Sequence, residues 1–233
     1  MKTIILAGGL GTRFSEETDS KPKPMIMIDH RPILWHIMDI YASQGFSDFV
    51  IATGYKSEVI EEWIESLDTS WHVRAINTGL HTQTGGRLRM CVEEFSDQRF
   101  FATYGDGLGN VNLRRLLEFH QLKKSTITAT AVRPPARFGY MEIDNGVVTT
   151  FGEKNQVNEG WINGGFFVLD RDAVKQVFSD DEPLETGALT RLSSMKQFHA
   201  YQHEGFWFPM DTRNEQNVLA QLAKQNPPPW KKA

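Results

Sequence analysis

Residues 3–13 read TIILAGGLGTR, a short apolar run of strand type that leads directly into a glycine-rich loop. Because glycine has no Cβ, the backbone N–H groups of such a loop can approach a polyphosphate, and a positive φ carries no steric penalty. The loop lacks the Gly-Lys-Ser/Thr ending of a Walker loop and the third glycine of a dinucleotide-binding fold, and it carries Arg13 instead. Lys21 and Lys23 add two more positive charges on a stretch that two prolines stiffen. The start of the chain therefore predicts a cationic nucleotide-binding loop at the end of a strand.

Strand-type and helix-type runs alternate through the first half of the chain. Strands are expected at residues 3–6, 49–52, 73–76, 100–103 and 127–132, and helices at 33–41, 57–67 and 112–123. Successive strand-helix-strand units favour parallel strands joined by right-handed crossovers, so this half predicts an open, doubly wound sheet. Ligands of such sheets bind at the carboxyl ends of the strands. The glycine-rich loop and residues 104–107 both follow such an end.

The second half of the chain has a mixed character. Residues 138–143 and 147–151 flank Asn145-Gly146, a pair that suits the tight turn of a β-hairpin. Residues 161–169 are expected to form one buried strand, and Thr212 with Glu215 predicts a capping box at the start of the last helix. The predicted fold class is α/β, with a Rossmann-like, doubly wound mixed sheet and a small β-hairpin subregion.

Length and composition limit the architecture and the partners. At 233 residues with 40% hydrophobic content, the chain predicts a single domain over 1–225, with halves 1–132 and 133–225, and an exposed proline-rich tail over 226–233. A net charge of −4 argues against nucleic acid as a partner. The single cysteine, Cys91, excludes an internal disulfide and suits a reducing compartment. No apolar run approaches the length of a membrane span, so we expect a cytoplasmic protein without membrane contact.

Asp106 and Asp211 are the candidate metal ligands. Mg²⁺ prefers oxygen ligands and is usually held by one or two carboxylates together with substrate phosphates. The alternative for Asp106 is a turn residue between two glycines, and the alternative for Asp211 is a partner of the last helix's N-terminal dipole. From the residues alone, both interpretations stay open for Asp106, and the helix-dipole role is favoured for Asp211.

A series of motifs occurs in order along nearly the whole chain: LAGGLGTR at 6–13, PKP at 22–24, TQTGGRL at 82–88, TYGDG at 103–107, RFG at 137–139, GWINGGFFVL at 160–169, GFW at 205–207 and PMDT at 209–212. This series resembles the motifs of the sugar-phosphate nucleotidyltransferases, and within them those of the glucose-1-phosphate cytidylyltransferases. The resemblance implies a nucleotide-diphospho-sugar transferase fold of the GT-A-like type. Its first half would bind the nucleotide and its second half the sugar phosphate.

The resemblance also implies a role for each matching residue. Arg13 and Lys23 would be catalytic, with Arg13 holding the departing pyrophosphate and Lys23 bridging the phosphates of the two substrates. Asp106 and Asp211 would hold Mg²⁺. The nucleotide would be bound by Leu6, Ala7, Gly8, Gly9, Gly11, Thr12, Thr82, Gly86, Arg87 and Gly105, and the sugar phosphate by Gly139, Glu153, Lys154 and Asn163.

The implied reaction joins CTP to a sugar 1-phosphate, with α-D-glucose 1-phosphate as the expected acceptor and CDP-glucose and pyrophosphate as products. Two alternatives keep the fold: transfer from UTP or dTTP or to another phosphorylated acceptor in surface-glycan synthesis, and a catalytically silent nucleotide-sugar sensor. A nicotinamide-dependent oxidoreductase is disfavoured, because Thr53 and Gly54 stand where a ribose-binding acid is expected.

Two departures from the family pattern concern details. Asn155 follows the Glu-Lys pair where the family has proline, and the chain crosses from Leu67 to Thr78 in fewer residues than its relatives. The shortened segment contributes to subunit contacts in those relatives. A homo-oligomer is therefore possible, but its form is left open.

Overall fold

Eight strands form the central sheet of the computed structural model, which describes residues 1–11, 14, 18, 20–134, 140–152, 160–179 and 181–231. The strands run in the order β11-β8-β12-β6-β1-β4-β5, and β13 also pairs with β8. Their bounds are β1 Thr3–Leu6, β4 Asp48–Thr53, β5 His72–Asn77, β6 Arg99–Tyr104, β8 Ile127–Val132, β11 Ile162–Asn163, β12 Phe167–Asp170 and β13 Phe198–His203. The four strands β5, β4, β1 and β6 are parallel, whereas β12 pairs antiparallel with both β6 and β8. The predicted mixed α/β sheet is confirmed.

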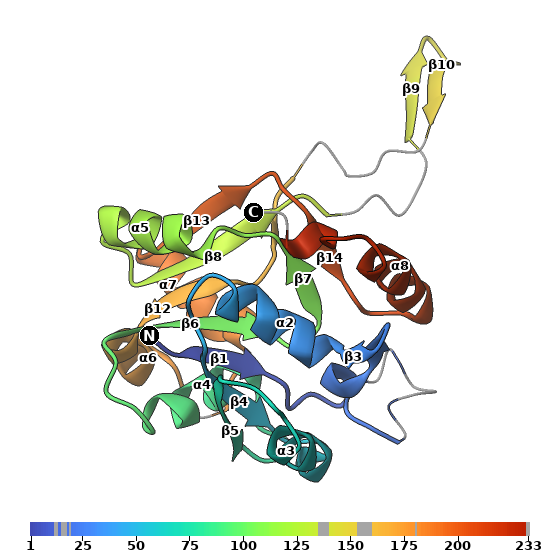
Figure 1. The fold of residues 1–233 in the computed structure, drawn as a ribbon. Helices are drawn as coiled ribbons and strands as arrows, with labels where there is room; N and C mark the ends of the chain where they lie inside the picture. The colour runs from blue at the N-terminus through green and yellow to red at the C-terminus, as the bar shows by residue number, and fades with distance from the viewer. Residues whose placement is uncertain are drawn as a thin grey trace.

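Helices cover both faces of this sheet (Figure 1). The α-helices are α2 Ile33–Ala42, α3 Ser57–Glu65, α4 Thr84–Val92, α5 Leu113–Lys123, α6 Arg171–Val177, α7 Thr190–Ser194 and α8 Arg213–Ala223. Successive strand residues point to opposite faces. Accordingly Ile5 packs in the core cluster that contains α2, and Ile4 in the cluster that contains α4. None of the helices in the described ranges is both long and apolar enough to cross a membrane.

Short ladders lie outside the central sheet. Strand β2 Met27–Ile28 pairs with β3 Arg31–Pro32, and β7 Gly107–Gly109 pairs with β14 Trp207–Pro209. The predicted hairpin is confirmed as β9 Tyr140–Asp144 and β10 Val147–Gly152, with positive φ at Asn145 and Gly146 in the turn. Figure 1 shows this hairpin standing away from the sheet. The predicted capping box of Thr212 and Glu215 is also present at the start of α8.

The expectation of one strand over residues 161–169 was wrong. The chain forms β11, turns, and then forms β12, because Gly165 and Phe166 both adopt positive φ, 75° and 46°. At Gly164 a Cβ atom would lie 2.6 Å from a methyl of Val132, so this close approach needs glycine. The turn lets β12 enter the sheet between β8 and β6 while β11 stays near its edge.

The prediction of an exposed tail was wrong at Trp230, which is only 2% exposed. The prolines exclude an α-helix but not a tight turn, and Pro229–Lys231 forms the 3₁₀ turn η4. The Trp230 ring lies 5.5 Å from the ring of His36 and 6.0 Å from that of Phe206. Burial of so large an apolar side chain outweighs the cost of ordering the tail. Trp230 therefore packs against α2 and the segment that leads into β14.

Trp230→Ala should lower the free energy of unfolding by about 3–5 kcal/mol, because it removes a buried indole and leaves a cavity. Urea unfolding followed by circular dichroism measures this change. Leu122→Ala is the control, since Leu122 is 80% exposed and its truncation should cost less than about 0.5 kcal/mol. Equal stability of the Trp230 variant and the parent protein would contradict the packing role of the tail.

Candidate active site

The glycine-rich loop begins where β1 ends, beside the end of β6. Strand pairing brings Leu6 opposite Tyr104, and the N–H of Gly105 donates to the carbonyl of Leu6 at 3.0 Å. A Cβ on Gly105 would lie 2.8 Å from that same oxygen, so the two chain segments can approach this closely only with glycine there. The first half of the loop and the Tyr104–Asp106 segment therefore lie side by side at the ends of β1 and β6.

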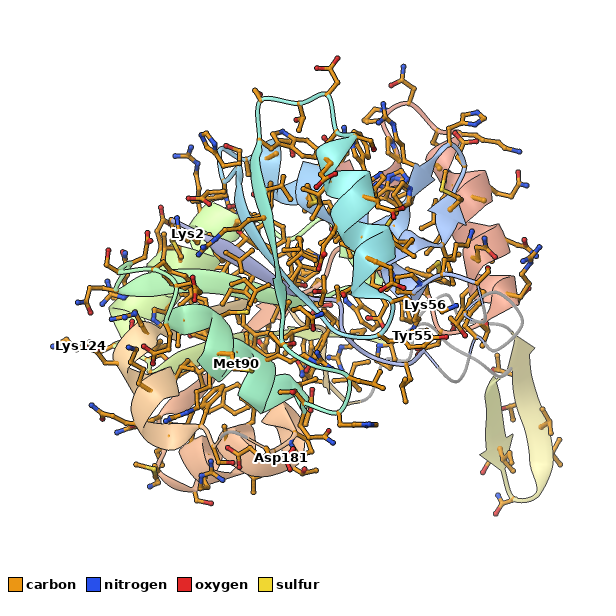
Figure 2. The ribbon with its side chains drawn as sticks, turned by 90° about the horizontal axis from the view of Figure 1, so that it is seen from below. Lys2, Tyr55, Lys56, Met90, Lys124 and Asp181 are labelled. Carbon is orange, nitrogen blue, oxygen red and sulfur yellow. The ribbon has the colours of Figure 1, made fainter. Side chains whose placement is uncertain are left out.

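Tyr55 follows β4, the strand that pairs with β1, and is hydrogen-bonded to the glycine-rich loop. Its N–H donates to the carbonyl of Gly8 at 3.2 Å, and its hydroxyl donates to the carbonyl of Thr18 at 3.0 Å. Figure 2 shows Tyr55 and its neighbour Lys56 near the start of α3, with Lys2 at the opposite end of β1. The site therefore lies at the carboxyl end of the parallel strands, as the sequence predicted.

The two predicted metal ligands converge on Lys23. The Lys23 Nζ atom lies 2.7 Å from Asp106 Oδ2 and 2.7 Å from Asp211 Oδ1. The β7–β14 ladder explains the convergence, because β7 follows Asp106, β14 precedes Asp211, and the N–H of Met210 donates to the carbonyl of Asp106 at 2.8 Å. The structure thus places both carboxylates at a single point.

Lys23 keeps its charge in this position. Burial alone would lower the pKa of its ammonium group, but the carboxylates of Asp106 and Asp211 together raise that pKa above the ordinary value. Within the described ranges, no group of three or more histidine, cysteine, aspartate or glutamate side chains gathers where a metal could bind. The two aspartates are therefore a pair of oxygen ligands that would need further oxygens from a substrate to complete a metal's shell.

Arg87, in helix α4, is hydrogen-bonded to the glycine-rich loop and to the segments beside it. Its side chain is only 4% exposed, and its guanidinium donates to the carbonyls of Gly8, Thr53, Gly79 and Leu80 and to the hydroxyl of Thr78. These partners belong to three segments: the loop, the end of β4 and the stretch after β5. Arg87 thus ties together the chain segments that shape the site.

Among the residues that the structure describes, no carboxylate balances the charge of Arg87. All five of its hydrogen-bond partners are neutral, and among the described residues no acidic side chain forms an ion pair with it. Burial lowers the pKa of the guanidinium, but arginine stays protonated at neutral pH. It therefore adds a positive potential under the loop, which favours an anionic ligand.

A cavity of about 370 Å³ opens between these elements. Its walls include most of the predicted residues: Leu6, Ala7, Gly8, Gly9, Gly11, Lys23, Thr82, Arg87, Gly105, Asp106 and Asp211. Gly86 is buried in α4 and does not line it. Gln83, next to Thr82, lines the cavity as well, and so do Pro24, Thr84 and Tyr104, which the sequence did not single out as ligands. For Thr84 and Tyr104 the available signal was position, since one begins a helix and the other ends a strand.

Asn163 joins the site through Tyr104. Its Nδ2 atom donates to the Tyr104 hydroxyl at 2.9 Å, and that hydroxyl donates in turn to Glu185. Five predicted residues lie outside the described ranges: Thr12, Arg13, Gly139, Glu153 and Lys154. Their roles stay predictions.

Comparisons with a family model and with known proteins agree on one family. The family model described as nucleotidyl transferase matches residues 2–210. The chain is 39% identical to the glucose-1-phosphate cytidylyltransferase of Salmonella typhi, with 99% of both proteins covered. It is 36% identical to the probable glucose-1-phosphate cytidylyltransferase of Bacillus subtilis, again with 99% of both covered. The resemblance inferred from the motifs is thereby confirmed.

Solved structures agree on the fold. HddC from Yersinia pseudotuberculosis, complexed with GMP-PN, has a TM-score of 0.75 and 23% sequence identity over 96% of this chain and 99% of that chain. At this level of identity the likeness concerns the fold alone.

Proposed function

The chain belongs to the nucleotidyl transferase family, and on this premise we propose that it transfers a cytidylyl group from CTP to α-D-glucose 1-phosphate. The products would be CDP-glucose and pyrophosphate. The observation that carries the chemistry is the convergence of Asp106 and Asp211 on Lys23 at the cavity of the glycine-rich loop. The choice of CTP and glucose 1-phosphate is supported by the two relatives of that name, which match along their full length.

Mg²⁺ fits the residues present. Asp106 and Asp211 offer carboxylate oxygens that lie close enough together to hydrogen-bond one ammonium nitrogen. Two carboxylates together with phosphate oxygens are a usual ligand set for this ion. Bound there, Mg²⁺ would neutralise and orient the phosphates of the triphosphate. Removal of divalent cations with EDTA should then abolish turnover, and added Mg²⁺ should restore it.

The chain's own groups account for positioning and charge. An oxygen of the sugar phosphate attacks the α-phosphorus, and the bond from that phosphorus to the oxygen bridging the β-phosphate breaks, so pyrophosphate leaves with the bridging oxygen. The attacking oxygen is already ionised at neutral pH, so no general base is needed. The reaction brings two anions together, and positioning with charge neutralisation supplies most of its catalysis.

Lys23 is placed to supply that neutralisation, because its ammonium faces the cavity with the pKa raised. Arg87 adds positive potential under the loop without touching the reacting atoms in our proposal. We propose Arg13 for the departing pyrophosphate and Lys154 for the sugar phosphate, on the strength of the motif match alone.

Pyrophosphate release tests this function. Glucose 1-phosphate and Mg²⁺ are supplied with CTP, UTP, dTTP, ATP or GTP in parallel, and we expect the highest kcat/KM with CTP. Preference for another base would keep the reaction class and overturn the base assignment. Silence with all five would point to a different phosphorylated acceptor, or to a nucleotide-sugar sensor if no acceptor supports turnover.

A further inference from the structure

Three side chains from distant parts of the chain meet at one side of the cavity. Tyr104 ends β6, Asn163 belongs to β11, and Glu185 lies in the π-helical turn η3 Leu184–Leu189. The Tyr104 hydroxyl accepts from Asn163 at 2.9 Å and donates to Glu185 Oε1. Thr84 donates to the second carboxylate oxygen, Oε2, at 3.2 Å. Tyr104 and Thr84 both line the cavity, and Glu185 is hydrogen-bonded to both of them.

Backbone partners fix the orientation of Asn163 and of Thr84 in this cluster. Asn163 Oδ1 accepts from the N–H of Gly165 at 3.0 Å, so the amide nitrogen must face Tyr104. The Thr84 hydroxyl accepts from the N–H of Leu184 at 2.7 Å, so its own hydrogen is available for Glu185. The hydroxyl hydrogens of Tyr104 and Thr84 are thus both committed to the carboxylate.

What the cluster offers to a ligand is therefore mainly lone pairs. Each oxygen of a carboxylate can accept more than one hydrogen bond, and Glu185 is exposed, beside two residues that line the cavity. The Tyr104 hydroxyl donates its hydrogen to Glu185 and therefore offers no free donor to a ligand. Such a surface attracts hydroxyl groups, which donate, and repels phosphate, which does not.

Lys23 presents the opposite character to the same cavity. The Lys23 ammonium attracts phosphate. It is hydrogen-bonded to Asp106, which follows Tyr104 by two residues. A ligand that carries a phosphate at one end and hydroxyls at the other would match both features.

We propose that Tyr104, Asn163 and Glu185 form a specificity site that reads the hydroxyls of the sugar 1-phosphate acceptor, with Glu185 as its principal acceptor of hydrogen bonds. This inference rests on the proposed function and deepens it, because it assigns the acceptor's recognition to a carboxylate outside the sequence motifs. The hydroxyls of the ligand bind at Glu185 rather than at Lys23, so the Lys23 ammonium stays available for the phosphate.

Glu185→Gln tests the site with almost no change in shape. We expect KM for glucose 1-phosphate to rise about ten- to hundredfold, since a hydrogen bond to a charged group is weakened, while KM for CTP changes less than twofold. Tyr104→Phe should move KM in the same direction. Glu93→Gln is the matched control, because Glu93 is an exposed carboxylate that pairs with Lys175 away from the cavity, and it should leave both KM values unchanged.

Monodeoxy analogues of glucose 1-phosphate give a readout that a purely structural role would not move. If Glu185 reads a hydroxyl, the parent protein discriminates against the analogue that lacks it, and Glu185→Gln loses that discrimination. An equal rise in both KM values, or unchanged discrimination, would overturn the proposal.

Calorimetric titration of glucose 1-phosphate, in the presence of a non-hydrolysable CTP analogue, separates this inference from the proposed function. Weaker binding to Glu185→Gln than to the parent supports the specificity site even if no nucleotide supports turnover. A parent protein that binds no glucose 1-phosphate, or a variant that binds it equally well, overturns it.

Discussion

Replacing Arg87 with methionine should lower the free energy of unfolding by about 3–5 kcal/mol and reduce nucleotide affinity at the same time. The carbonyls of Gly8 and Thr53 lie in buried residues and would lose their guanidinium donor. Each buried polar group left without a partner costs about 1–3 kcal/mol. Nucleotide affinity falls because the loop loses its brace and the cavity loses a positive charge. Urea unfolding and calorimetric titration with CTP measure the two effects.

Arg115→Met is the control for this prediction. Arg115 is exposed on α5 and its substitution should change stability by less than about 0.5 kcal/mol. An Arg87 variant with parental stability and parental CTP affinity would show that the brace is dispensable.

A double-mutant cycle with Gly8 sharpens the assignment. A Cβ on Gly8 would lie 2.1 Å from Arg87 Nη1, so Gly8→Ala must displace the guanidinium. Because both substitutions break the same contact, the double variant should lose less stability than the two single losses added together. Additive losses would mean that Gly8 and Arg87 act independently.

Local patterns in the sequence predicted those elements that local physics determines. Short runs of strand type predicted β1, β4 and β8, the Asn145-Gly146 pair predicted the hairpin turn, and Thr212 with Glu215 predicted the capping box. In each case the signal and the structure it specifies lie within a few residues of each other. Such signals can be recognised without knowledge of the tertiary contacts.

Local sequence patterns did not predict helix α4 or its part in the site. The helix begins with Thr84-Gly85-Gly86, and glycine disfavours helix. The structure shows why glycine is needed there, since a Cβ on Gly85 would lie 2.7 Å from the carbonyl oxygen of Glu182. The same approach brings Glu185 beside Thr84. Both features depend on a contact between segments far apart in the chain.

The convergence of the two aspartates is a tertiary property as well. The motifs named Asp106 and Asp211 separately, but their meeting depends on β7 and β14, whose few residues carry no periodic pattern. Trp230 is a similar case, because a proline-rich tail carries no signal for the ring contacts of Trp230 with His36 and Phe206. Motifs can thus identify residues without giving the geometry that joins them.

Asp106→Asn should reduce kcat for pyrophosphate release by a factor of about 10²–10³ at saturating CTP and glucose 1-phosphate, the size of effect seen when one charge-stabilising group is lost. The substitution keeps the shape of the side chain and removes one of the two carboxylates that meet at Lys23. If these carboxylates hold Mg²⁺, the Mg²⁺ concentration for half-maximal rate should also rise. Asp211→Asn should behave alike. Initial rates over a Mg²⁺ series measure both quantities.

Asp48→Asn separates a metal role from a general role of aspartate–lysine pairs. Asp48 Oδ2 pairs with Lys2 Nζ at 2.5 Å, at the start of β1 and β4, whereas the cavity lies at their carboxyl ends. This variant should keep the parental rate and the parental Mg²⁺ dependence. If Asp106→Asn retained full turnover at saturating Mg²⁺, the metal assignment would be wrong. A fall in rate without any change in Mg²⁺ dependence would instead assign the carboxylate to the placement of Lys23.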